Sequence, residues 1–421
     1  MLKGGALLYA VFLTFLVSMI TGFAVLYAYY YNKHLDIAMI RDNLVNNVSS
    51  AIELYLAGPG LLPPGQEKTI TLYPEEKNSE VTLENRSWGA YNIIVSSATW
   101  KSFSYSKIIM CGNNIFEDDK TALYLTDKNN YLSLCGKTIL KGTCYLPKLG
   151  PRRAYIEGQS FSGSKLVNGE LKISTNKLPA LDSEFTRINT GRLKGTFNSN
   201  DSMSWFDEYK EKDSIVNSFS NKTLRLICTN PVNLGHKTVK GNIIIYSEKP
   251  VIVPKNSNIE DIIIYAPAII FKSGFAGNLQ AFVTDSMIIE KECTLNYPSF
   301  AGILNTEKKI TQPTIRIQEK SEISGGMVLL NTIKDSKKHS VLSINKDVTI
   351  YGQVYCNDFV ELKGKIYGSL YCDNFILVTA SAVYENHLLN AVINPDGLSE
   401  YYAACNFLEK TESMEVVKCL Y

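Results

Sequence analysis

Residues 350–360, IYGQVYCNDFV, and residues 366–376, IYGSLYCDNFI, are two copies of one pattern that lie 16 residues apart. Six of the eleven positions are identical, and the apolar positions that differ exchange one apolar residue for another. Short runs of β-branched and aromatic residues that end at turn formers are typical of β-strands, whereas helix-pair repeats have much longer periods. A period near 16 therefore indicates one turn of a parallel β-solenoid built from short strands.

The same texture continues upstream with longer periods. Residues 243–246 recur at 262–265, an offset of 19, and residues 251–253 recur at 269–271 and 287–289, at offsets of 18. Residues 304–306 recur at 330–332, and the Ile-x-Gly of 323–325 recurs at 350–352, at offsets of 26 and 27. The longer steps predict the same coil with charged corner loops at 307–313 and 334–339.

We therefore predict a mainly β protein whose body is a right-handed parallel β-solenoid. Its regular part covers 223–385, its first irregular coils cover 116–177, an insertion occupies 178–222, and a C-terminal cap occupies 386–421. Equivalent residues of neighbouring coils lie about 4.8 Å apart in such a stack. This predicts that Cys356 stacks on Cys372, Tyr351 on Tyr367 and Phe359 on Phe375.

The Gly-punctuated coils of 223–385 resemble those of bactofilins and related polymer-forming β-solenoids. The resemblance rests on repeat texture over about 170 residues. It implies a rigid scaffold that is able to associate end to end with its own copies.

The N-terminal segment indicates where in the cell the protein lies. No charged side chain occurs from residue 4 to residue 32, and residues 6–26 are almost wholly apolar. About 20 apolar residues in a helix span a bilayer core. Tyr27, Tyr29, Tyr30 and Tyr31 follow, and then Lys33, which is typical of an interfacial aromatic belt closed by a cation. We predict a transmembrane anchor over 1–33; the alternatives are a cleaved signal peptide and a buried helix of a soluble protein.

The start of the chain, KGGALL at residues 3–8, resembles the start of some minor pilins and pseudopilins. That resemblance implies an apolar helix that continues directly into an exported domain. We accordingly expect a single-pass membrane protein with a cytoplasmic N-terminus and a C-terminal domain in the periplasm or at the cell surface.

Apolar residues then recur at steps of three and four, which predicts an amphipathic helix over 34–58 with one packing face. These residues are Ile37, Ile40, Leu44, Val48, Ile52 and Tyr55. The helix should stop near Gly58, because prolines at 59, 63 and 64 lack the backbone donor. Alternating short runs between 69 and 111 predict an antiparallel β neck over 59–115.

Chemistry is sparse in this sequence. With 43 basic and 41 acidic residues the net charge is +2, which argues against nucleic acid as a partner, and only 4 histidines are present. No catalytic motif occurs, so we assign no catalytic, cofactor-binding or metal-binding residue and expect no cofactor. The cysteines make no C-x-x-C motif. They allow the pairs Cys135–Cys144, Cys356–Cys372 and Cys405–Cys419, and the alternative for Cys356 and Cys372 is stacked, unbonded thiols.

These features favour a membrane-anchored structural scaffold in a pilus-like or cell-envelope assembly. Its expected partners are the lipid bilayer, further copies of the chain and other envelope proteins. The alternatives are an enzyme that acts on polysaccharide from the outer face of the solenoid and a glycan-binding surface protein. A groove lined by three or more charged residues from adjacent coils would favour the enzyme.

Overall fold

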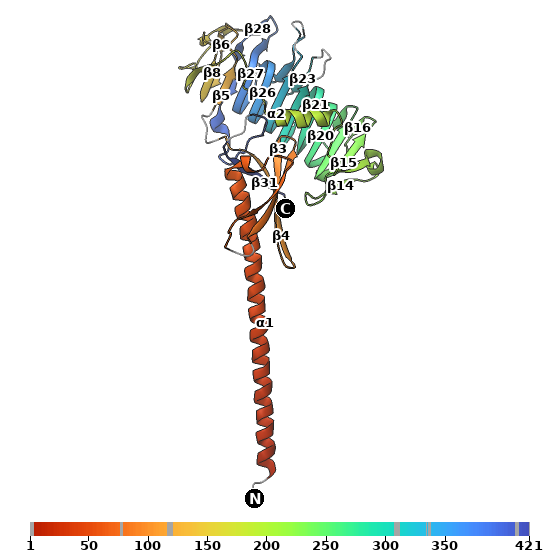
Figure 1. The fold of residues 1–421 in the computed structure, drawn as a ribbon. Helices are drawn as coiled ribbons and strands as arrows, with labels where there is room; N and C mark the ends of the chain where they lie inside the picture. Colours follow the sequence, from red (N-terminus) through yellow and green to blue (C-terminus); the bar gives the residue numbers. More distant parts are fainter. Residues whose placement is uncertain are drawn as a thin grey trace.

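The computed structural model describes residues 4–75, 79–115, 121–306, 312–333, 335, 338–408 and 412–420. The predicted corner loops 307–313 and 334–339 lie largely outside these residues, as does the beginning of the segment KGGALL. The described chain is mainly β, with one long N-terminal helix that projects from a β-rich body (Figure 1).

Helix α1 (Gly4–Ala57) is continuous from the apolar segment into the amphipathic one. Its apolar half is long enough to cross a membrane, with a mean hydropathy of 2.1 over the most apolar window, and none of that window is buried within the protein. The apolar half is therefore not a core helix of this fold. The helix ends at Ala57, and Pro59 opens the short 3-10 helix η1 (Pro59–Leu61), as the prolines predicted.

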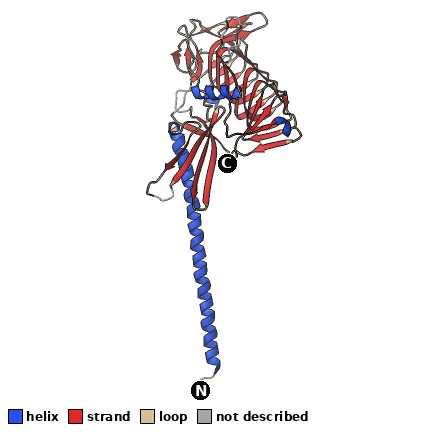
Figure 2. Cartoon of the chain, turned by 45° about the vertical axis from the view of Figure 1, so that its right-hand side comes forward, coloured by secondary structure: helices blue, strands red, loops and turns tan. Residues whose placement is uncertain are grey.

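An antiparallel sheet, which we call the neck, packs beside the second half of α1 (Figure 2). Its strands follow the order β1-β2-β3-β4-β31, so the last strand of the chain forms one edge. Their bounds are β1 (Glu67–Thr71), β2 (Glu80–Trp88), β3 (Tyr91–Trp100), β4 (Phe103–Asn113) and β31 (Met414–Cys419). The antiparallel neck was predicted, but the contribution of the C-terminal strand was not.

The predicted apolar stripe of the helix is its packing face. Leu44, Val48 and Tyr55 are at most 2% exposed and pack against neck residues such as Ile94 and Ile109. Burial of each such side chain contributes roughly 1.5–3 kcal/mol. This packing holds the second half of α1 to the neck and leaves its first half bare.

The other strands form the body, a mainly parallel system that we call the stack. Most of its strands belong to one sheet that closes on itself, while β29-β6-β9 and the β10–β11 hairpin form two small separate sheets beside it. Its N-terminal strands are β5 (Thr121–Leu125), β6 (Leu132–Cys135), β7 (Ile139–Leu140), β8 (Thr143–Leu146), β9 (Pro151–Arg153) and β12 (Leu171–Ile173), with the small hairpin β10 (Tyr155–Ile156) and β11 (Gln159–Ser160). Its middle strands are β13 (Ser202–Trp205), β14 (Ser214–Asn217), β15 (Leu224–Cys228), β16 (Val232–Asn233), β17 (Thr238–Gly241), β18 (Ile243–Ser247), β19 (Val251–Val253), β20 (Asn258–Phe271) and β21 (Ala276–Ile289). Its later strands are β22 (Thr294–Asn305), β23 (Thr314–Ile317), β24 (Glu322–Asn331), β25 (Val341–Ile344), β26 (Thr349–Leu362), β27 (Lys365–Val378), β28 (Val383–Glu385), β29 (His387–Leu389) and β30 (Val392–Ile393).

The register of the stack follows the predicted offsets. Ile244 pairs with Ile263, Val251 with Ile269 and then Met287, Leu304 with Leu330, and Ile323 with Ile350. In the repeat itself Cys356 pairs with Cys372, and the Tyr351 and Tyr367 rings stack with centroids 5.3 Å apart. These predictions are confirmed.

The predicted stack of Phe359 on Phe375 is wrong. A β-bulge after Cys356 shifts the register, so that Phe359 pairs with Asn374 and Phe375 pairs with Val360. The Phe359 ring instead lies edge-on to His339, with centroids 4.7 Å apart.

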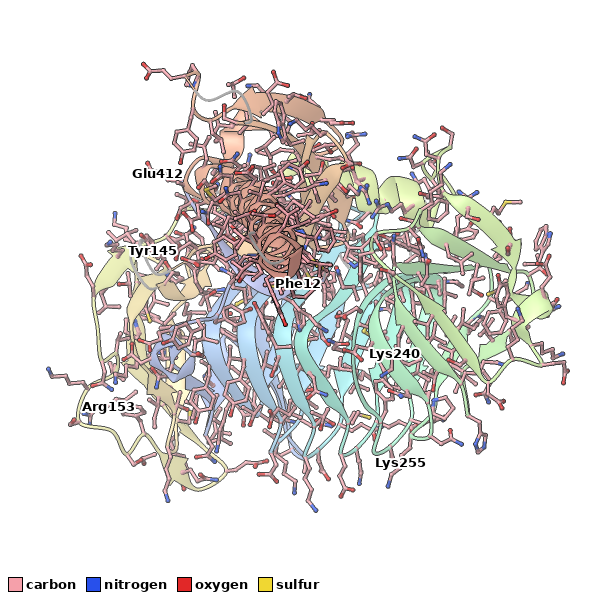
Figure 3. All side chains as sticks on the ribbon, turned by 90° about the horizontal axis from the view of Figure 1, so that it is seen from below. Phe12, Tyr145, Arg153, Lys240, Lys255 and Glu412 are labelled. Atoms are coloured by element: carbon pink, nitrogen blue, oxygen red, sulfur yellow. The ribbon has the colours of Figure 1, made fainter. Side chains whose placement is uncertain are left out.

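The order of the strands in the stack differs from their order in the sequence. β5 pairs with β27, β8 pairs with β5, and β12 pairs with β8. The strands of 121–175 therefore lie beyond the C-terminal strands of the stack and not before residue 224. In Figure 3 the segment that bears Tyr145 and Arg153 accordingly flanks the blue strands at one end of the row.

One inward-facing column runs through the whole stack and demonstrates this order. Its members, from one end to the other, are Ser204, Leu226, Ile245, Ile264, Ala281, Ala301, Met327, Val354, Leu370, Leu123, Cys144 and Leu171. Every member between the two ends is buried. The stack thus begins at β13 and ends at β12.

Two predicted boundaries change as a result. Of the expected insertion 178–222, residues 202–217 form the first strands of the stack, and the return segment 178–200, with helix α2 (Ser183–Leu193), runs outside it. Of the expected C-terminal cap 386–421, β29 pairs with β6 and β30 lies between β27 and β7, so these residues are strands within the body and not a cap on its end. The remaining tail returns to the neck as β31.

Candidate functional site

The predicted interface residues all lie on the bare part of α1. Tyr27, Tyr29, Tyr30 and Tyr31 are 54–73% exposed, and Lys33 follows half a turn later and is exposed. The rings of Tyr27 and Tyr31 are stacked, with centroids 6.2 Å apart. This girdle encircles the helix, which is the arrangement expected of residues that sit at the level of lipid headgroups.

The predicted disulfides do not form. Cys135, Cys144, Cys372, Cys405 and Cys419 are all free thiols, which leaves none of the three proposed pairs bonded. Cys372 stacks under Cys356 in the core, where burial raises the pKa of the Cys372 thiol. The alternative of stacked, unbonded thiols is thus the one observed. Cys419 alone is exposed.

The neck is joined to the stack by a buried turn. Gly89 and Ala90 form the β2–β3 turn. The Gln280 side chain, on β21 of the stack, makes two hydrogen bonds to the backbone of this turn. Gln280 Oε1 accepts from the Ala90 amide at 2.6 Å, and Gln280 Nε2 donates to the Trp88 carbonyl at 2.9 Å. A Cβ on Gly89 would lie 2.1 Å from Gln280 Oε1, so only glycine fits here.

Helix α2 crosses the outer face of the stack beside this turn (Figure 2). Asp182 caps it by accepting from the Phe185 amide at 2.7 Å, and Phe185 packs among Phe282, Phe300 and Phe407. The cap and the aromatic contacts explain why this short segment is helical although most of its other residues are polar.

Two residues of α2 tie both bodies together. Asn189 donates to the Gly89 carbonyl at 3.1 Å and accepts from the Tyr265 hydroxyl at 2.8 Å. Arg192 donates to the same hydroxyl at 3.1 Å and to the Ser87 carbonyl at 2.9 Å. Burial raises the pKa of Tyr265, which keeps this hydroxyl protonated and able to donate.

A third contact comes from the C-terminal strand. Lys418 Nζ lies 2.6 Å from Asp261 Oδ2 and 3.0 Å from Glu260 Oε1, both on β20. Lys240 lies on the other side of Glu260 at 3.1 Å. Hydrogen bonds from Lys418 and Lys240 lower the pKa of the Glu260 carboxyl.

Beside this joint lies a cleft of about 810 Å³, bounded by β2, α2 and the first coils of the stack. Its volume falls within the range of small-molecule sites. Seven charged side chains line it: Glu84, Arg86, Glu184, Arg187, Arg192, Asp201 and Lys222. Arg86 is held by Glu84 in a bidentate pair at 2.6 and 2.7 Å.

Aromatic rings line the cleft together with the charged groups, and Arg225 lies against one of them, Phe197, without lining the cleft itself. The Arg225 guanidinium lies 4.8 Å from the centre of the Phe197 ring, and its Nε is buried without a hydrogen-bond partner among the described residues. Burial raises the pKa of Asp201, against the opposing effect of Arg192 and Arg225. Four basic side chains against three acidic ones line the cleft, which suits a polar ligand with an anionic group. No cluster of described residues is suited to a metal ion.

The charged residues of this cleft belong to the neck, to α2 and to coil edges, so they do not form the row from adjacent coils that would favour a polysaccharide enzyme. The cleft could not be predicted from the sequence because its walls come from three separate segments, residues 64–93, 184–201 and 219–244. Comparison with known proteins finds no matching family model, no matching curated protein and no matching solved structure.

Proposed function

We propose that this chain is a membrane-anchored structural scaffold that holds a rigid parallel β-solenoid outside the membrane. The observation that carries the proposal is the joint: a turn, a helix and a C-terminal strand lock the neck to the stack at three separate places. A protein that only needed a tether would need no such joint, because a flexible linker suffices.

The solenoid interpretation of the stack rests on its pairing. Long strands such as β20 pair along their length with β17, then β18, then β19, as expected if each coil bends around corners above the previous coil. The column from Ser204 to Leu171 supports the same interpretation. The right-handed sense of the coil stays a prediction.

The exported location can be tested with a native reporter. Cys419 is the exposed cysteine, and the other eight are buried. A membrane-impermeant maleimide should label intact cells at Cys419 and fail to label the Cys419→Ser variant. Labelling that requires permeabilised cells would place the stack on the cytoplasmic side and overturn the exported topology.

Assembly with further copies is supported by the two ends of the stack. The end strands expose apolar side chains, with Leu171 and Ile173 at 52% and 71% exposure on β12, and Met203 and Val216 at 52% and 67% at the opposite end. Unpaired apolar strand edges favour pairing with another chain. In a continued register Leu171 of one copy lies over Ser204 of the next.

This register gives a direct experiment. In a Cys419→Ser background, Leu171→Cys combined with Ser204→Cys should form a disulfide-linked ladder of multimers in membranes under mild oxidation. Either substitution alone should leave monomers, because the two ends differ. A double variant that stays monomeric would exclude end-to-end association through these strands.

The cleft favours glycan binding as a second function. Amide, hydroxyl, guanidinium and aromatic groups line one concave surface, which suits a sugar that carries a carboxylate. Saturable binding of a uronic-acid oligosaccharide that is lost in Arg187→Ala and kept in Lys255→Ala, on the opposite edge (Figure 3), would support it. Equal binding by both variants would place the ligand elsewhere.

A further inference from the structure

The β3–β4 hairpin of the neck ends in a tip that combines aromatic and basic side chains. Trp100 pairs with Phe103, and Lys101 and Ser102 form the turn between them. The Lys101 Nζ lies 5.8 Å from the centre of the Trp100 ring, and Tyr105 is 36% exposed just above. No described residue of the stack or of the return segment lies over this tip, which hangs below the neck in Figure 1.

The tip points toward the same end of the molecule as the apolar half of α1. Two hydrogen bonds to the helix show this direction. Asn85, which pairs with Ile94 of β3, donates to the Tyr55 hydroxyl, and Ser96, further along β3, donates to the Val48 carbonyl. Strand β3 therefore descends along the helix as its residue numbers rise.

The end of the hairpin is reached near Arg41. The Arg41 guanidinium lies 5.7 Å from the centre of the Phe103 ring, and Ile40 packs with Trp100 and Phe103 in the same cluster. At 1.5 Å per residue, Tyr31 lies about 15 Å below Arg41 along the helix. The Lys101–Ser102 turn extends one residue further toward Tyr31 than Phe103 does.

We propose that the tip formed by Trp100, Lys101, Phe103 and Tyr105 is a second membrane contact, which rests on the lipid headgroups beside the anchor helix. This inference rests on the proposed function, because it requires α1 to span the bilayer. Spanning helices are commonly tilted by about 20°, and a tilt toward the sheet lowers the tip toward the headgroup layer, where its long Trp, Tyr and Lys side chains complete the reach. Trp and Tyr prefer this layer, and Lys is attracted to anionic lipids.

The consequence is a fixed orientation. A helix alone leaves its domain free to turn about the helix axis and to lean in any direction. A second contact on one side sets the direction of the tilt, and the joint passes that orientation to the stack.

The test uses the three tryptophans of the full chain in liposomes that contain phosphatidylglycerol and a headgroup-nitroxide lipid. Trp88 is 3% exposed, whereas Trp205 is 47% exposed at the far end of the stack and serves as the matched control. We expect strong quenching by the nitroxide lipid, with most of it lost in Trp100→Phe and all of it kept in Trp205→Phe.

Two failures are distinguishable. Full chain that does not float with the liposomes would show that α1 does not anchor it, and the proposed function would fall. Full chain that floats with the liposomes while Trp100→Phe leaves the quenching unchanged would refute the tip contact alone. A Lys101→Glu variant should lose more quenching in anionic liposomes than in neutral ones. An equal loss of quenching in the two kinds of liposome would also contradict the contact.

Discussion

Gly89 shows how one residue controls the joint. Its φ of +64° is in the left-handed region, and Gln280 fills the space where a side chain would begin. Conformation and space both demand glycine, so two separate costs apply to any substitution.

We predict that Gly89→Ala destabilises the protein by about 2–4 kcal/mol, because the backbone is strained and the Gln280 side chain is displaced from two hydrogen bonds. Gly65→Ala is the matched control. Its φ is +81°, but nothing lies within 4 Å of an added Cβ, so only the backbone cost of about 1 kcal/mol applies. Chemical denaturation in detergent measures both, and equal losses would contradict the role of Gln280.

The glycines of the repeat are required for a different reason. Gly325, Gly352 and Gly368 pair with one another in neighbouring coils, and a Cβ on Gly352 would lie 1.7 Å from the Gly325 carbonyl oxygen. Close approach of successive backbones explains why this position of the repeated pattern is glycine in each copy.

At the scale of elements, α2 is the clamp between neck and stack. Asn189 is fully buried and satisfies groups of both bodies. We predict that Asn189→Leu costs about 2–3 kcal/mol, since it leaves the Gly89 carbonyl and the Tyr265 hydroxyl short of a partner. Arg187→Ala, on the exposed face of the same helix, should change the free energy of unfolding by less than about 0.5 kcal/mol. A similar loss in both variants would mean that helix propensity, and not the clamp, decides the outcome.

The C-terminal strand should make the joint sensitive to acid. Because the folded-state pKa of Glu260 is lowered, its contribution is present above its unfolded pKa, about 4.3, and is lost as the pH falls through the folded value. We predict that Lys418→Met lowers the melting temperature at pH 7 and that the gap to the unmodified chain closes below about pH 4.

Lys320→Met is the control for this effect. Lys320 is 70% exposed and lies 3.7 Å from Glu292, which is also exposed, so its removal should have little effect at any pH. A gap for Lys418→Met that stays constant down to low pH would show that the ion pairs with Glu260 and Asp261 do not account for its contribution.

At the scale of the whole molecule, the chain builds its stack out of sequence order. It enters from the neck at β5, completes the far coils, returns over the outer face through α2, and then fills the rest of the stack from β13 to β30. The last strand returns to the neck, so both ends of the chain's β-structure meet in one sheet.

We predict that the order of the strands controls which segments unfold locally when one buried residue is replaced. Leu123→Asp buries a charge in the column between Leu370 and Cys144, which costs several kcal/mol and opens the neighbouring coils. Hydrogen exchange should rise in residues 365–378 and stay low in residues 224–228. The reciprocal variant, Leu226→Asp, should deprotect residues 202–217 and 243–247 and spare residues 121–146. Exchange that spreads from Leu123 to residues 224–228 would contradict the observed order.

The sequence by itself determined the long apolar N-terminal helix, its packing stripe, its end near Gly58, the antiparallel neck and the register of the repeats up to Cys356. These follow from local rules: helical spacing, proline chemistry, and stacking of like residues at a constant offset. The β-bulge after Cys356 could not be predicted, because one unpaired residue leaves no sign in the sequence pattern.

Only the tertiary structure decided which strand of the stack pairs with which. An apolar strand of 121–125 pairs equally well in principle with residues 224–228 or 370–372, because stacking depends on a matching face and not on distance in the chain. The return segment resolves this choice, because α2 buries Phe185 and Asn189 against the outer face only when the chain runs back along the stack. The joint and the cleft exist for the same reason: their residues come from distant segments, and no local pattern brings Gly89, Asn189 and Gln280 together.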